Sequence, residues 1–132
     1  MNEQSMAVGG QESIAPLLEQ NRLSDLIQPL VKEIFLFETY VAGTTHLDDP
    51  SVLQTIRDGD ELTLRREDNP FDGRAILVLT KKGEKLGYVP RRDNVVFSRL
   101  MDAGKMLTAK ILEIEKLGDY THINIDIYLL DF

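Results

Sequence analysis

Residues 61–89, ELTLRREDNPFDGRAILVLTKKGEKLGYV, have the pattern of three strands joined by short connections. Over residues 61–66 two leucines alternate with polar residues, which is the period of a strand with one buried face. Residues 75–80 form a continuous apolar run, as expected of a central strand. The turn at 82–84 then leads into a third strand over 85–89. The stretch therefore predicts a three-stranded meander.

Three further strands are predicted on either side of this meander. Residues 34–41 are rich in aromatic and branched side chains, which favour the half-buried surface of a pleated sheet. Residues 106–116 and 121–130 are joined by the turn Leu117-Gly118-Asp119, and in the second of them isoleucine or leucine alternates with polar residues. These patterns bring the number of predicted strands to about six.

Two helices are predicted between the strands. Residues 50–57 fit one short helix, and Asp93 or Asn94 is predicted to cap a longer one that ends before Gly104. The apolar side of the longer helix is expected to comprise Val96, Phe97, Leu100 and Ala103. Six strands and one or two packed helices in about 100 residues predict a mainly β fold, a small, partly open β-barrel of the SH3-like or OB-like sort.

The N-terminal region differs from the rest of the chain. Residues 1–12 carry no apolar period and are expected to form a loose arm. Ser13 then offers a cap for an amphipathic helix with a kink at Pro29, and such a helix docks on a core or pairs with a second copy. We therefore expect an arm and helix over residues 1–33 and one β-barrel domain over residues 34–132.

The composition limits the function classes. The chain has 132 residues and no cysteine, so it has no disulfide framework, no thiol nucleophile and no thiolate metal cage, and its two histidines are too few for a His-rich zinc site. No apolar run is long enough to cross a bilayer, and the N-terminus lacks a basic signal-peptide region. We expect a cytoplasmic protein that needs neither membrane nor cofactor.

Charge is uneven along the chain. The formal net charge is -7, which argues against a protein that coats nucleic acid through its whole surface. Residues 65–99 nevertheless hold nine basic and five acidic side chains, a local charge of +4, so the remainder sums to -11. A basic band on an acidic body fits a short or terminal contact with a phosphate backbone, and it also fits an ordinary solvated face.

The connection between the first two strands of the meander is the densest group of chemical side chains. It mixes guanidinium, amide, aromatic and carboxylate groups within residues 65–74. Asn-Pro and Asp-Gly are strong turn dipeptides, so Asn69 and Asp72 could serve the chain reversal alone. Phe71 is then either a lid on the core or an exposed stacking platform, and the residues themselves leave both options open.

Three motifs in this region resemble the signature of the HIRAN domain, a small β-barrel module found alone in bacteria and fused to Swi/Snf-type helicases in eukaryotes. The motifs are VAGTTH at 41–46, LRREDNPFD at 64–72 followed by Ala75-Ile76, and GEKLGYVPR at 83–91. The resemblance covers roughly residues 34–130. It implies a targeting module, not a catalyst, that binds single-stranded nucleic acid, DNA above all, in a repair or replication-fork context beside a helicase or repair protein.

The resemblance also implies roles for particular residues. Phe71 would stack on the terminal base, and Asp72 would accept a hydrogen bond from a free 3'-hydroxyl and repel a further phosphate. Asn69 would bind the terminal nucleotide or fix the turn. The phosphates would be held by Arg65 and Arg91. Near the last nucleotides the site would be lined by Thr45 and His46, where DNA-binding family members carry a basic and an aromatic residue.

Other functions rest on fewer residues. No phosphate-binding Gly-rich loop is present in the sequence, and the acidic residues near Asp72 would have to converge to hold Mg2+ for a nuclease. His122 lies on the polar side of the last predicted strand and is expected to be solvated. The main alternative is a non-enzymatic protein-interaction module, or a homo-oligomer that associates through the N-terminal helix.

Overall fold

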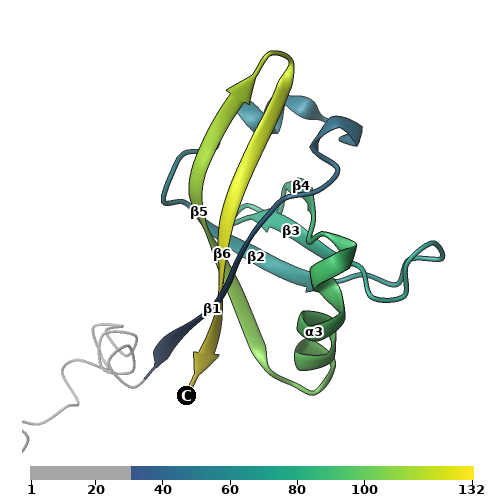
Figure 1. Ribbon diagram of the computed structural model, residues 1–132, viewed down its shortest axis with the longest axis vertical. Helices are drawn as coiled ribbons and strands as arrows, with labels where there is room; N and C mark the ends of the chain where they lie inside the picture. Colours follow the sequence, from purple (N-terminus) through teal and green to yellow (C-terminus); the bar gives the residue numbers. More distant parts are fainter. Residues whose placement is uncertain (1–30) are drawn as a thin grey trace, which may run out of the picture. The chain divides into compact units, whose positions relative to one another are not determined.

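Six strands form a single antiparallel sheet in the order β1-β6-β5-β2-β3-β4 in the computed structural model, which describes residues 31–132 (Figure 1). The strands are β1 (Lys32–Tyr40), β2 (Glu61–Arg66), β3 (Ile76–Thr80), β4 (Lys85–Tyr88), β5 (Met106–Leu117) and β6 (Tyr120–Asp131). All six predicted strands are confirmed. The predicted arm and N-terminal helix fall, up to residue 30, outside the described residues.

Two hairpin systems build the sheet. Strand β2 pairs with β3 from Leu62 opposite Thr80 to Arg66 opposite Ile76, and β3 continues into β4, so the predicted meander is confirmed. Strands β5 and β6 form a long hairpin whose turn contains Gly118 at a φ of 64°, a conformation that glycine adopts without steric cost. Pairing between β2 and β5 joins the two systems.

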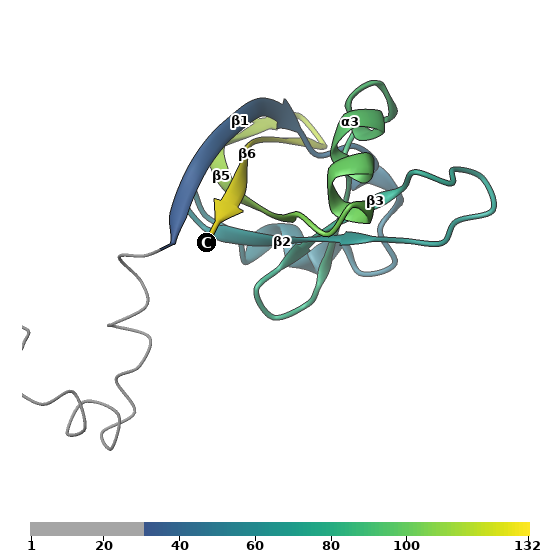
Figure 2. The same cartoon turned by 90° about the horizontal axis from the view of Figure 1, so that it is seen from below.

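The two ends of this strand order meet at one point. Ala42, just after β1, and Tyr88, in β4, exchange backbone hydrogen bonds of 2.7 and 2.9 Å. Gly87 allows this approach, because its φ is 151° and a Cβ atom there would overlap the carbonyl oxygen of Ala42. The sheet is therefore curved into a half-barrel. Figure 2 shows helix α3 beside the open side of this curved sheet.

The inner face of the half-barrel forms the core. Its buried side chains come from strands β2 to β6, from the connections beside them and from α3, which contributes Phe97, and partly buried Leu36 of β1 packs against them. The predicted alternation in the last strand is confirmed, since Ile123, Ile125 and Ile127 are fully buried. The other core residues are Val41, Val52, Ile56, Leu62, Leu64, Ile76, Val78, Leu86, Val89, Leu107, Ala109 and Ile111.

Helix α3 spans Arg91–Asp102, and its predicted start was wrong. Pro90 occupies the cap position, and its carbonyl accepts 3.0 Å hydrogen bonds from the backbone N–H groups of Asp93 and Asn94. Those two side chains are unavailable as caps because both bond to other elements, as described below. The C-terminal prediction is confirmed, because Gly104 follows the helix with a φ of 93°.

Two details of the predicted helices also change. Val96 and Ala103 were predicted to lie on the apolar side of this helix. Val96 is 62% exposed and Ala103 is also exposed, so neither belongs to the buried side of α3. The short helix expected over residues 50–57 is a 3-10 helix, η3 (Pro50–Gln54), and a second one, η2 (Thr44–His46), follows β1. Asp49 caps η3 by accepting a hydrogen bond from the backbone of Ser51.

Candidate functional site

The connection between β2 and β3, residues 67–75, extends away from the sheet beside α3 in both ribbon views (Figures 1 and 2). Arg66 holds its base. The guanidinium donates to the carbonyl oxygens of Ala75 (2.7 Å) and Gly73 (2.8 Å), and it forms an ion pair with Asp102 at 2.9 Å. This arginine therefore ties both ends of the loop to the C-terminal turn of α3, which sequence reasoning had not anticipated.

Asn69 organises the tip of the loop. Its side-chain oxygen accepts a hydrogen bond from the backbone N–H of Phe71 at 2.8 Å, and its amide nitrogen donates to Glu67 at 3.1 Å. The same Glu67 oxygen accepts the hydroxyl of Tyr88 at 2.7 Å. The Tyr88 hydroxyl is the largest cause of a lowered pKa at Glu67. A relay of hydrogen bonds thus connects the seam of the half-barrel to the backbone of Phe71.

Phe71 stands out from this tip with 84% of its surface exposed. The option of a lid on the core is therefore wrong, and a platform open to solvent remains. A ligand that stacks on this ring removes its apolar surface from water, and this burial stabilises the complex.

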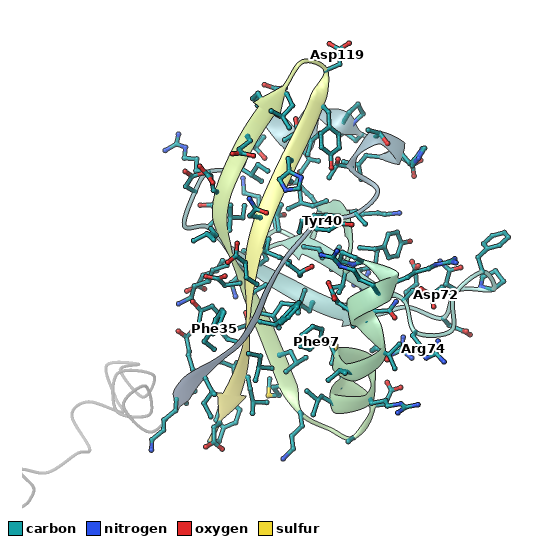
Figure 3. All side chains as sticks on the ribbon, in the orientation of Figure 1. Phe35, Tyr40, Asp72, Arg74, Phe97 and Asp119 are labelled. Carbon is teal, nitrogen blue, oxygen red and sulfur yellow. The ribbon has the colours of Figure 1, made fainter. Side chains whose placement is uncertain are left out.

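Asp72 follows Phe71 and points back toward α3. Its Oδ1 accepts the backbone N–H of Arg74 at 3.0 Å, and its Oδ2 accepts the side-chain amide of Asn94 at 2.9 Å. The guanidinium of Arg91 lies 3.6 Å from Oδ2. The pKa of Asp72 is lowered, first by the hydrogen bond from Arg74 and then by Asn94 and Arg91. Figure 3 labels Asp72 and Arg74 on the loop beside α3.

Four of the predicted site residues are in contact in the folded protein. Asn69, Phe71 and Asp72 share one turn, and Arg91 joins them from α3 by donating to the carbonyl oxygen of Phe71 at 3.1 Å. Arg65 is exposed on β2 and makes no side-chain hydrogen bond or ion pair with any residue from 31 to 132. Within this part of the chain, no hydrogen bond or ion pair joins it to the other four.

Thr45 and His46 are exposed on η2, which follows the seam residue Ala42 in the chain. The buried side chain of Thr44 anchors this segment by donating to the carbonyl of Thr121 at 3.2 Å. Neither Thr45 nor His46 forms a hydrogen bond with the loop in the described part of the chain. Their connection to it runs through Ala42 and Tyr88.

An aromatic and basic strip beside the loop was missed in the sequence. The guanidinium of Arg92 lies 5.2 Å from the ring centre of Tyr40, and Tyr40 stacks on His122 at 5.6 Å. His122 is half-buried and also contacts Tyr120, so the expectation that it is simply solvated was wrong. Tyr40 is labelled in Figure 3 near the start of α3. No local pattern reveals this strip, because it joins β1, α3 and β6.

The acidic residues of the loop serve other partners. Glu67 and Asp72 accept hydrogen bonds from protein groups, and no three His, Asp or Glu residues within 31–132 are arranged to hold a metal ion. In the same part of the chain, no helix has both the length and the apolar character needed to cross a membrane.

Comparisons with known proteins identify the fold. The family model of the HIRAN domain matches residues 34–129. A crystal structure of a protein from Lactobacillus plantarum is similar with a TM-score of 0.72 and 30% sequence identity, over 77% of this chain and 99% of that one. The crystal structure of the HIRAN domain of human HLTF is similar with a TM-score of 0.60 and 14% identity, over 74% and 78%. A search of the curated proteins finds no match.

Proposed function

Because this chain belongs to the HIRAN domain family, whose members are nucleic-acid-binding modules, we propose that it captures the 3'-hydroxyl end of a single strand, DNA in particular. One observation carries the proposal. An aromatic ring that is 84% exposed stands next to a carboxylate with a lowered pKa, on a loop held by Arg66 and Asn69. A stacking surface and an acceptor-only group side by side suit a terminal nucleotide with a free hydroxyl.

The chemistry of each group supports the terminal position. Phe71 would stack on the last base without regard to its identity, since every base offers a π face. Asp72 is ionised at neutral pH, so it accepts a hydrogen bond from a hydroxyl and repels a phosphate at the same place. An interior nucleotide always carries that phosphate, so the carboxylate selects strand ends.

The basic side chains would hold the preceding nucleotides. Arg91 touches the loop, and its neighbour Arg92 lies over Tyr40, at the start of the strip that continues to His122. A strand that leaves Phe71 past the start of α3 toward β1 and β6 would meet a cation and then a stacked aromatic pair, which is the combination that single strands bind without sequence preference. Arg65 and the η2 residues Thr45 and His46 would border this path. We further propose that the protein acts at repair sites or replication forks, beside a helicase or repair protein.

Fluorescence anisotropy of a short labelled strand with a 3'-hydroxyl or a 3'-phosphate tests the proposal. We expect tighter binding of the hydroxyl end. Asp72→Ala should abolish the preference, whereas Asp68→Ala, which removes the same charge from an exposed position of the same loop, should retain it. Equal binding of both ends by the unchanged protein would refute end capture.

The stacking role has its own variant. Phe71→Ala should weaken binding of every strand by about 1–3 kcal/mol, whatever the last base. Phe35→Ala removes an exposed aromatic ring from β1, away from the loop, and should leave binding unchanged. Loss of affinity in both variants would mean that strands bind through general apolar contact and not through Phe71.

A further inference from the structure

Asn94 is a buried polar residue under the loop. Only 2% of its surface is exposed, although it is the fourth residue of α3 and lies beside the exposed Arg91 and Arg92. Its backbone N–H donates to Pro90 at 3.0 Å, and its side-chain amide donates to Asp72 Oδ2 at 2.9 Å. Asn94 is thus held in the helix by its backbone and joined to the loop carboxylate by its side chain.

The hydrogen bond from Asn94 orients a carboxylate that the loop alone would hold at one oxygen. The backbone N–H of Arg74 bonds Oδ1, and Asn94 bonds Oδ2, so rotation about the carboxylate axis is blocked at both oxygens. Each oxygen of an ionised carboxylate has two acceptor positions. Both oxygens of Asp72 therefore retain capacity for an incoming hydroxyl.

An amide also leaves the charge of Asp72 in place. A lysine or arginine at the position of Asn94 would orient the carboxylate but neutralise it. The cation nearest to Oδ2, Arg91, stands 3.6 Å away with 73% of its side chain exposed, where water screens the attraction. A neutral donor at Oδ2 thus keeps the repulsion that an additional phosphate would meet.

We propose that Asn94 is the positioning residue that sets the specificity of this site for a free 3'-hydroxyl over a 3'-phosphate. This inference rests on the proposed function. Asn94 acts through Asp72: it holds the carboxylate in one orientation and adds no positive charge of its own beside Oδ2.

Two substitutions in the full-length chain test this role with the labelled 3'-hydroxyl and 3'-phosphate strands. Asn94→Leu keeps four side-chain heavy atoms branched at the same carbon and removes the donor, and the ratio of the two affinities should fall about tenfold, the effect of losing one hydrogen bond to a charged group. Asn94→Asp keeps the shape and places a second carboxyl against Asp72. Two adjacent carboxyls share a proton, so the ratio should change with pH more steeply than in the unchanged protein between about pH 5 and 8.

The pH profile separates positioning from general destabilisation. The charged groups around Asp72 are Arg91 on α3, Arg74 in the loop and Arg66 at the end of β2, and none of them is a carboxyl. The 3'-phosphate itself loses its second proton near about pH 6, so the unchanged protein supplies the reference profile of the ratio against pH. A variant that merely loosens the fold loses affinity for both strands and keeps this reference profile.

Ser98→Ala is the matched control. Ser98 is equally buried one turn further along α3, but its hydroxyl donates within the helix to Val95 and not to the loop. The inference is overturned if Asn94→Leu keeps the ratio of the unchanged protein and Asn94→Asp keeps its pH profile, or if Ser98→Ala lowers the ratio equally. Absence of any preference in the unchanged protein refutes the proposed function itself and the inference with it.

Discussion

Arg65 and Arg66 are adjacent in the sequence and serve different purposes. Strand geometry turns successive side chains to opposite faces, so Arg65 faces solvent and Arg66 faces the loop. Arg66 then finds two carbonyl oxygens and Asp102, which raises its pKa chiefly through the Asp102 hydrogen bond. Arg66 therefore stabilises the loop, whereas Arg65 is the one of the two that the proposed function assigns to binding.

Alanine substitutions at these two neighbours should affect different properties, stability at Arg66 and strand binding at Arg65. Arg66→Ala leaves the loop carbonyls and Asp102 without their donor, and it should lower the free energy of unfolding by about 1–3 kcal/mol. Arg65→Ala should change stability by less than about 0.5 kcal/mol. It should weaken strand binding and reduce the salt slope by about 0.7 if Arg65 contacts one phosphate. Thermal unfolding and anisotropy over a salt series measure both effects, and equal destabilisation would contradict the assignment.

The seam between Ala42 and Tyr88 matters at the scale of elements. It closes the strand order, and through the Tyr88 hydroxyl it supports the loop that presents Phe71. Closing the half-barrel thus also positions the candidate site. Gly87 is the residue on which this closure depends, because no side chain fits between the two backbones.

Gly87→Ala should strongly destabilise the protein. The added methyl group meets the carbonyl of Ala42 and the side chain of Val41, and the φ of 151° is itself unfavourable for alanine. Gly83→Ala, in the β3–β4 turn, adds a methyl group into open space at a φ of 88° and should cost only about 1–2 kcal/mol of backbone strain. Denaturant unfolding compares the two variants. A loss at Gly87 no greater than at Gly83 would show that the seam tolerates separation.

The loop should open in acid before the sheet unfolds. The pKa values of Glu67 and Asp72 are lowered in the folded protein, so the open loop binds protons more readily than the closed one. Their stabilisation is present above the ordinary pKa values of 4.5 and 3.8 and is lost as the pH falls through the lowered ones. An NMR titration of the Phe71 and Arg74 amide signals should show this opening as the pH falls below the ordinary pKa values of the two carboxyls. Simultaneous loss of the β6 signals would contradict it.

The charge distribution matters at the scale of the whole molecule. The net charge of -7 repels a phosphate backbone, whereas Arg65, Arg91 and Arg92 are exposed near the loop. A short contact therefore suits this protein better than wrapping.

The salt dependence of strand binding should be shallow. Two or three phosphate contacts predict a slope of log K against log salt between about -1.4 and -2.1 for a single strand. Anisotropy titrations from low to moderate salt measure the slope. A slope steeper than about -4 would indicate an extended basic surface and contradict binding at a strand end alone.

The sequence by itself determined the strands and the chemistry of the loop. Alternation in residues 61–66 and 121–130 is a local property of the chain, and so is a turn that contains Gly118, which is why their positions could be predicted. Asn69, Phe71 and Asp72 likewise lie within four consecutive residues and share one turn.

Only the tertiary structure decided which residues support that loop. Asn94 contacts Asp72, which is 22 residues away in the sequence, and Arg66 contacts Asp102, which is 36 residues away. Tyr40 and His122 come from the first and last strands of the domain's sequence. The predicted helix start failed for the same reason. Asp93 and Asn94 have the side chains of helix caps, but Thr39 and Asp72 take up their hydrogen bonds. Local patterns specify a backbone path, whereas a polar side chain bonds whichever partner the closed half-barrel places beside it.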